Sequence, residues 1–114
     1  MKPITELIAV DLEMTGLQVK TDRILEIGAV RLCQGRIVDT FQTFVNPHRK
    51  IDARITELTG ITPEMVADAP EAGEALQKFL AFEKDAPLLG HNVIFDFGFL
   101  KQQAVNQGIT WNRE

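Results

Sequence analysis

Two groups of carboxylates in this sequence have the residue types and spacing that metal chemistry needs. Asp11 and Glu13 close the apolar run 7–10 with one residue between them. On a β-strand both side chains leave the same face, and their oxygens can bind one hard cation such as Mg²⁺. Asp96, at the end of His-Asn-Val-Ile-Phe-Asp, would complete the ligand set. Three carboxylates held this close repel one another, so the pattern demands a cation.

The elements that must position these groups begin with strands. The run 7–13 is apolar until its acidic end, which is typical of a central strand covered on both faces. Segments 23–32 and 36–45 are rich in Ile, Val, Phe and Thr. Gln34 and Gly35 between them suit a tight turn, so we expect an antiparallel hairpin.

Helix signals follow in the second half of the sequence. Gly60 would stop a short helix, Thr62 with Pro63 would start another, and Asn92 would cap the last one. The pattern predicts helices at 52–58, from Pro63, at 70–83 and at 93–106, with a short strand at Leu88 and Leu89. Three strands, a helix, a strand and a helix form the front part of a ribonuclease-H-like α/β layer.

Composition sets further limits. The 114 residues, 45% of them hydrophobic, can bury one modest core, so we expect a single domain at 1–114. A net charge of −4 argues against a general affinity for nucleic acid, which must therefore be held locally. The single cysteine, Cys33, rules out an internal disulfide and fits a reducing compartment. No membrane span or signal peptide is recognised, so a cytoplasmic protein is expected.

Four segments together resemble a known family. They are Asp-Leu-Glu-Met-Thr-Gly at 11–16, Arg-Ile-Leu-Glu-Ile-Gly-Ala-Val at 23–30, Leu-Thr-Gly-Ile-Thr at 58–62, and His-Asn-Val-Ile-Phe-Asp-Phe-Gly-Phe-Leu at 91–100. In this order they resemble the DEDD 3′→5′ exonucleases, in particular the proofreading epsilon-subunit type of bacterial DNA polymerase III. The resemblance covers essentially the whole chain, and it implies an α/β fold with a ribonuclease-H-like mixed sheet flanked by helices.

The resemblance implies a site with two divalent ions, Mg²⁺ or Mn²⁺. Two ions about 3.5 to 4 Å apart can activate a water and stabilise the leaving oxygen when a phosphodiester is broken. By the family pattern Asp11 bridges both ions, Glu13 holds the ion that activates the water, and Asp96 binds the second ion. The implied substrate is the 3′ end of a single-stranded nucleic acid, and a DNA polymerase subunit is an implied partner.

Further positions match the family's contacts to the terminal nucleotide. Gly16 either lets the backbone approach the substrate or simply allows the turn. Leu17, Leu58 and Thr59 match positions near the terminal base, although leucines on a helical face also belong to cores. Asn92 contacts the nucleotide or caps the helix after it. The expected substrate-binding set is Met14, Thr15, Gly16, Leu17, Leu58, Thr59 and Asn92.

The sequence departs from the family in one respect. The family carries a third motif, in which a His is the general base and an Asp four or five residues later completes the metal ligands. This chain ends at Glu114 before such a motif, and neither His48 nor His91 has the required context. We therefore expect a C-terminally truncated domain without its last strand and helix, either a fragment or a shortened homologue. Because positioned proton transfer contributes about 10² to 10⁴-fold to such a reaction, the isolated chain is expected to be weakly active or inactive. Self-association would hide the sheet edge and the apolar face left open.

Two functions of different classes remain open at this stage. The first is a metal-dependent 3′→5′ exonuclease, or part of one, that releases nucleoside monophosphates from single-stranded DNA. The second is a catalytically silent module that binds metal and nucleotide as a subunit of a replication complex. RNA is a further possible substrate, because the run 14–17 also resembles oligoribonuclease.

Overall fold

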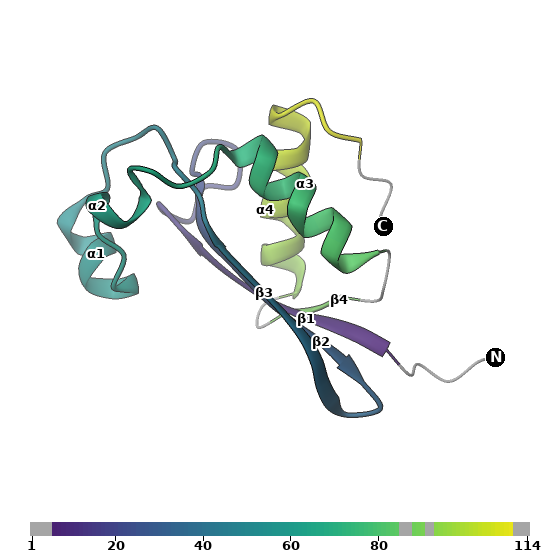
Figure 1. Cartoon of the computed structure of the whole chain (residues 1–114). Helices are drawn as coiled ribbons and strands as arrows, with labels where there is room; N and C mark the ends of the chain where they lie inside the picture. Colours follow the sequence, from purple (N-terminus) through teal and green to yellow (C-terminus); the bar gives the residue numbers. More distant parts are fainter. Residues whose placement is uncertain (1–5, 85–87, 91–92, 111–114) are drawn as a thin grey trace.

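A four-stranded mixed sheet forms the centre of the protein. The computed structural model describes residues 6–84, 88–90 and 93–110, and for 88–90 and 93–97 it describes the backbone alone. The strands, which are labelled in Figure 1, lie in the order β3–β2–β1–β4 in the sheet. Strand β2 is antiparallel to β1 and β3, and β4 is parallel to β1. Their bounds are Glu6–Met14 for β1, Ile24–Cys33 for β2, Arg36–Phe44 for β3 and Leu88–Gly90 for β4. The predicted strands and the central position of β1 are confirmed.

The hairpin between β2 and β3 depends on its two turn residues. Gln34 and Gly35 both have positive φ, at 52° and 79°. A two-residue turn with this backbone twists in the same sense as its strands, which is why it favours hairpins. Cys33 ends β2 beside this turn and is a free, partly buried thiol.

Local capping residues fix the short helices. Asp52 accepts a hydrogen bond from the backbone N–H of Arg54, and Gly60, at φ 79°, ends the same helix. Thr62 caps the next helix, with Pro63 at its first position. None of the helices in the described ranges is long and apolar enough to cross a membrane. The helices are α1 at Ala53–Thr59, α2 at Pro63–Val66, α3 at Ala72–Glu83 and α4 at Val93–Asn106.

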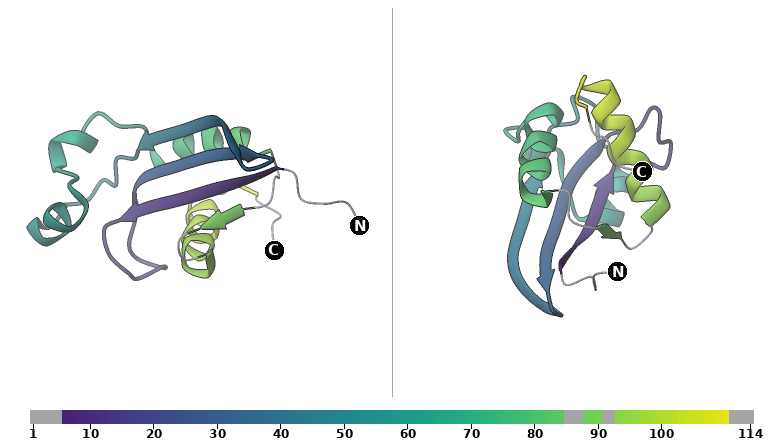
Figure 2. Two further views of the ribbon diagram at one scale, coloured as in Figure 1. Left: turned by 90° about the horizontal axis from the view of Figure 1, so that it is seen from below. Right: turned by 90° about the vertical axis from the view of Figure 1, so that its right-hand side faces the viewer.

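The main core lies between one face of the sheet and the pair α3 and α4. Ile8, Val10 and Leu12 point from β1 into this core, where they meet Phe79 of α3 and Phe99 of α4. Figure 2 shows the two helices beside the strands from two further directions. The other face of β1 is less covered, since Leu7 and Ala9 are half-buried. The prediction that β1 is covered on both faces is therefore wrong for the described part of the chain.

A second, smaller cluster lies beneath α1 and α2. It consists of the buried side chains of Leu25, Ile51, Ile61 and Val66. Leu25 belongs to β2, so this cluster ties the two short helices to the end of the sheet where β1 finishes. Figure 1 shows α1 and α2 projecting beyond that end of the strands.

Candidate active site

The two carboxylates of β1 lie on the face of the sheet that α3 and α4 do not cover. Alternation along the strand sends Ile8, Val10 and Leu12 into the core and sends Asp11 and Glu13 to the opposite face. Asp11 is exposed and Glu13 is half-buried. The prediction that both leave one face of a strand is thus confirmed.

The neighbouring strand leaves space beside Asp11 and adds a negative charge beside Glu13. Gly28 of β2 is the register partner of Asp11, and Glu26 is the partner of Glu13. Like charges on directly opposed residues destabilise a strand pair. Glu26 accepts a hydrogen bond from the side-chain amide of Gln42, with 2.8 Å between the amide nitrogen and the carboxylate oxygen. A bound cation would offset the repulsion among these three carboxylates.

The chain topology brings the first turn of α4 toward the same part of β1. Gly90, the last residue of β4, pairs with Val10, the neighbour of Asp11. α4 begins shortly afterwards, and Asp96 belongs to its first turn. The Asp96 side chain and the whole of Asn92 lie outside the described residues, so their roles remain predictions.

The donor set of Asp11 and Glu13 fits a divalent ion. Carboxylate oxygens are the ligands that Mg²⁺ and Mn²⁺ prefer, and an exposed position lets the ion keep waters in its remaining sites. Among the side chains that the structure describes, no group of three or more His, Cys, Asp or Glu residues is placed to hold a metal. Asp96, whose side chain lies outside those described, remains the predicted third ligand.

The loop after β1 is held together by one carboxylate. Asp22 accepts hydrogen bonds from the Thr15 hydroxyl at 2.9 Å and from the Gln18 backbone N–H at 3.0 Å. Arg49 also contacts it, with 3.2 Å between its Nη1 and Asp22 Oδ1. A Cβ atom on Gly16 would lie 2.7 Å from the Asp22 Cγ, which is too close. Gly16 therefore makes room for a side chain, a reason that the sequence analysis missed, as it missed Asp22.

Of the residues predicted to contact the terminal nucleotide, some have exposed side chains and others make contacts within the fold. Leu17 is 75% exposed and Leu58 is 77% exposed, so neither belongs to a core. The Thr59 hydroxyl donates to the carbonyl of Ile55 and accepts from the N–H of Ile61, so it helps to end α1. Met14 packs against the main core. The side chains of Leu17 and Leu58 are therefore free to contact a ligand. Those of Thr59 and Met14 are engaged in contacts within the fold.

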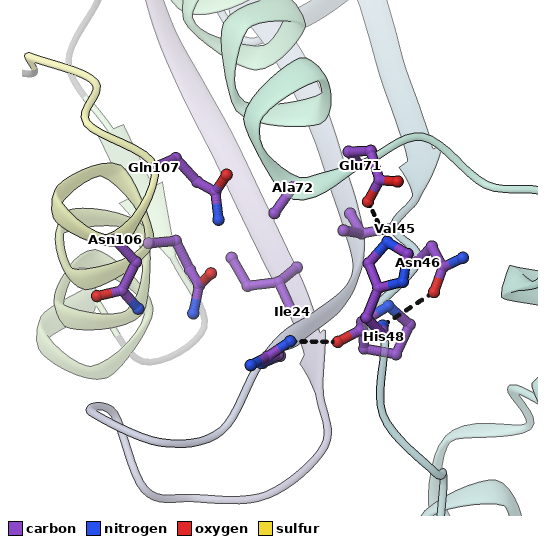
Figure 3. Close-up of a pocket in the computed structure, with 11 residues that line it drawn as sticks. Ile24, Val45, Asn46, His48, Glu71, Ala72, Asn106 and Gln107 are labelled. Carbon is purple, nitrogen blue, oxygen red and sulfur yellow. Dashed lines mark hydrogen bonds and ion pairs between the residues drawn. The ribbon is translucent and has the colours of Figure 1, made fainter.

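His48 occupies a different part of the molecule. The His48 side chain pairs with Glu71 (Figure 3). The His48 backbone N–H donates a hydrogen bond to the side-chain oxygen of Asn46 at 2.9 Å. The cavity that it lines, about 510 Å³, extends between Ala72 at the start of α3 and Gln103 in α4. These helices cover the sheet face opposite Asp11, and neither Asp11 nor Glu13 lines this cavity, so it is not the carboxylate site.

The fold and the carboxylate pair define a class of protein, and comparison with known sequences identifies it. The family model described as "Exonuclease" and named for RNase T matches residues 8–109. The chain therefore belongs to this exonuclease family, whose members use divalent metal ions.

Several curated proteins are similar to this chain. It is 50% identical over 105 residues to a PolC-type DNA polymerase III of Caldanaerobacter subterraneus, and the match covers 92% of the chain and 8% of the polymerase. It is 42% identical over 113 residues to a putative bifunctional exonuclease/endonuclease protein of Mycobacterium tuberculosis, covering 94% of the chain and 18% of that protein. The chain thus spans a small part of the length of these relatives.

Solved structures of exonuclease I share the fold. One, in complex with an inhibitor, superposes with a TM-score of 0.81 at 18% identity, covering 95% of this chain and 25% of that chain. Another, the Escherichia coli enzyme in complex with an oligonucleotide, gives a TM-score of 0.80 at 15% identity, covering 95% of this chain and 26% of the other. The predicted ribonuclease-H-like architecture is confirmed by these matches.

Proposed function

We propose that this chain is the metal-binding part of a 3′→5′ exonuclease that removes nucleoside monophosphates from single-stranded DNA. The observation that carries the proposal is the pair Asp11 and Glu13 on the open face of β1, with Gly28 leaving space beside the first. Two divalent ions would supply an activated water and stabilise the leaving oxygen. The chain's own part is to hold and orient those ions through Asp11, Glu13 and Asp96.

DNA is the better supported substrate, and proofreading is the better supported setting. The similar polymerases are named as DNA polymerase III, and a fold relative was solved with a DNA oligonucleotide. The exposed Leu17 and Leu58 offer apolar surfaces to a terminal base at the end of the sheet where the carboxylates lie. A polymerase is accordingly the proposed partner.

Strand-end labelling tests this proposal directly. The chain is joined for this test to a C-terminal segment that carries the family's third motif, and the same joined protein serves for every kinetic measurement below. With Mn²⁺ and a single-stranded DNA oligonucleotide, we expect label at the 3′ end to appear as mononucleotide at once and label at the 5′ end to appear only in shortened strands. The matched RNA strand should be degraded more slowly. Release of 5′-terminal mononucleotide, or activity unaffected by a chelator, would contradict the direction or the metal dependence.

Metal binding is expected to raise the thermal midpoint of the chain. An ion that binds the folded state alone stabilises it by about 2.7 kcal/mol when its concentration is a hundred times Kd. Asp11→Ala should remove this shift, because it deletes a carboxylate that would hold the ion, whereas Asp68→Ala, at an exposed position after α2, should keep it. Scanning calorimetry with and without Mn²⁺ measures the effect. An equal shift in the Asp11 variant would place the ion elsewhere.

A further inference from the structure

The loop at residues 15–22, between β1 and β2, is closed by a reciprocal pair of contacts at its two ends. The backbone N–H of Thr15 donates to the carbonyl of Arg23 at 2.8 Å. In return, the backbone N–H of Arg23 donates to the Thr15 hydroxyl oxygen at 2.9 Å. The same hydroxyl donates its own proton to Asp22, so Thr15 satisfies three partners at once. The loop base is therefore fixed directly after the carboxylates of β1.

The Asp22 carboxylate then fixes the inside of the loop. One oxygen accepts from the Thr15 hydroxyl and the other accepts from the backbone N–H of Gln18, so the two oxygens hold two different residues of the loop. The backbone N–H of Asp22 also donates to the carbonyl of Gln18 at 2.7 Å. The Asp22 side chain is 17% exposed: its bond with the Thr15 hydroxyl is partly buried, whereas its bond with the Gln18 N–H is exposed.

Two groups from distant segments anchor Asp22 to the rest of the fold. Arg49, which follows β3 by a few residues, contacts the carboxylate with its Nη1. Gln103 of α4, which is 4% exposed, donates from its side-chain amide to the Asp22 carbonyl at 3.2 Å. Asp22 therefore joins the loop to the segment after β3 and to the core helix.

We propose that Asp22 is a positioning residue for the exonuclease reaction: it holds the loop 15–18 in the conformation that receives the terminal nucleotide. This inference rests on the proposed function. Hydrogen bonds to a charged carboxylate are stronger than neutral ones, so one side chain can set the backbone of several loop residues. In this proposal Asp22 acts through the loop residues that it contacts, which are Thr15, Gly16 and Gln18.

Gly16 gives the proposal a sharp test. An alanine there would place its Cβ 2.7 Å from the Asp22 Cγ and 2.9 Å from Oδ1, so Gly16→Ala should displace the carboxylate. We call the contacts of the Asp22 carboxylate with Thr15 and Gln18 the clamp. Each of the single variants, Asp22→Ala and Gly16→Ala, should break it. With Asp22→Ala the obstructing carboxylate is gone, and adding Gly16→Ala should do no further harm. A double-mutant cycle measures this coupling.

We expect Asp22→Ala and Gly16→Ala each to lower kcat/KM on a single-stranded DNA oligonucleotide by roughly 10- to 100-fold, as misplacement of a substrate contact does. Most of the loss should be a higher KM, with the Mn²⁺-induced shift of the thermal midpoint kept. The kcat/KM of the double variant should match that of Asp22→Ala within about twofold, because coupled neighbours do not have additive effects. Gly73→Ala, whose Cβ would meet the movable end of Gln107, is the matched control and should leave kcat/KM unchanged.

Two results would overturn the inference. If the losses of the two single variants multiply in the double variant, Gly16 and Asp22 act separately. If Asp22→Ala lowers kcat and the Mn²⁺ shift together while KM is unchanged, its role is general folding rather than positioning.

Trypsin cleavage after Lys20, an exposed loop residue, separates this inference from the proposed function. Release of the clamp should speed that cleavage in the Asp22→Ala and Gly16→Ala variants whether or not the protein degrades DNA. Faster cleavage with no nuclease activity in the unmutated protein would remove the proposed function and, with it, the positioning role. Unchanged cleavage in an active protein would remove the clamp alone.

Discussion

Asp11→Asn is expected to reduce the rate of 3′ nucleotide release by on the order of 10³. Bound metal contributes several kcal/mol of transition-state stabilisation, and each 1.4 kcal/mol is about tenfold in rate. Asparagine keeps the size and one oxygen of the side chain but removes the charge that would bridge the ions. Because Asp11 is exposed, the variant should fold, and its thermal midpoint without metal should stay at or above that of the unmutated chain.

Single-turnover kinetics at saturating Mn²⁺ with 3′-labelled single-stranded DNA would measure this loss. Asp68→Asn, another exposed aspartate that lies away from β1, is the matched control and should keep the full rate. A loss smaller than about tenfold for Asp11→Asn would mean that the ions are held mainly by other residues. The assignment of the open face of β1 as the active site would then fail.

Phe79→Ala is expected to lower the free energy of unfolding by about 3 to 5 kcal/mol. Phe79 is fully buried in the main core, and its ring centroid lies 6.1 Å from that of Phe41 in an edge-to-face arrangement. Shortening this side chain to alanine removes the apolar contacts that join α3 to the sheet and leaves a cavity between them. Since small domains are stable by about 5 to 15 kcal/mol in total, a large part of the stability would be lost.

Equilibrium unfolding in urea measures the change in free energy. Val105→Ala removes apolar atoms from an α4 side chain that is 71% exposed, so it should change the free energy by no more than about 0.5 kcal/mol. Equal effects of the two substitutions would show that α3 does not pack on the sheet as described.

Local signals in the sequence predict most of this fold. Gly60, Thr62 and Pro63 set the bounds of α1 and α2 through backbone conformations and caps that involve near neighbours alone. Gln34 and Gly35 likewise fix the hairpin and with it the register of β2 and β3. The alternation in β1 correctly puts Asp11 and Glu13 on one face, since that result needs no knowledge of the partner strands.

Features that depend on contacts between distant segments could not be predicted in the same way. The predicted helix at 70–83 begins at Ala72, because the Pro70 carbonyl accepts the backbone N–H of Asn46 at 2.9 Å and Glu71 becomes the helix cap. Arg31 gives a second example. It lies on the helix-covered face of the sheet, where it pairs with Glu6 and stacks over the ring of Phe82, 5.1 Å from the ring centroid. Neither partner is near in sequence.

The same reason explains what was missed at the candidate site. Asp22 reads in the sequence as one polar loop residue among several, and its role appears when Thr15, Arg49 and Gln103 converge on it. The roles of the proposed metal ligands come from the family resemblance, and backbone alternation predicts the strand face of two of the three, Asp11 and Glu13.

The separate cluster beneath α1 and α2 has a consequence for how this protein can diversify. Leu58 belongs to α1. The packing of α1 and α2 depends on the cluster of Leu25, Ile51, Ile61 and Val66 rather than on the main core. Residues on the outside of these two helices can be exchanged without repacking the sheet against α3 and α4. Substitutions there can therefore change the surface near the end of β1, which the proposed function assigns to the terminal base, while the carboxylates of β1 keep their scaffold.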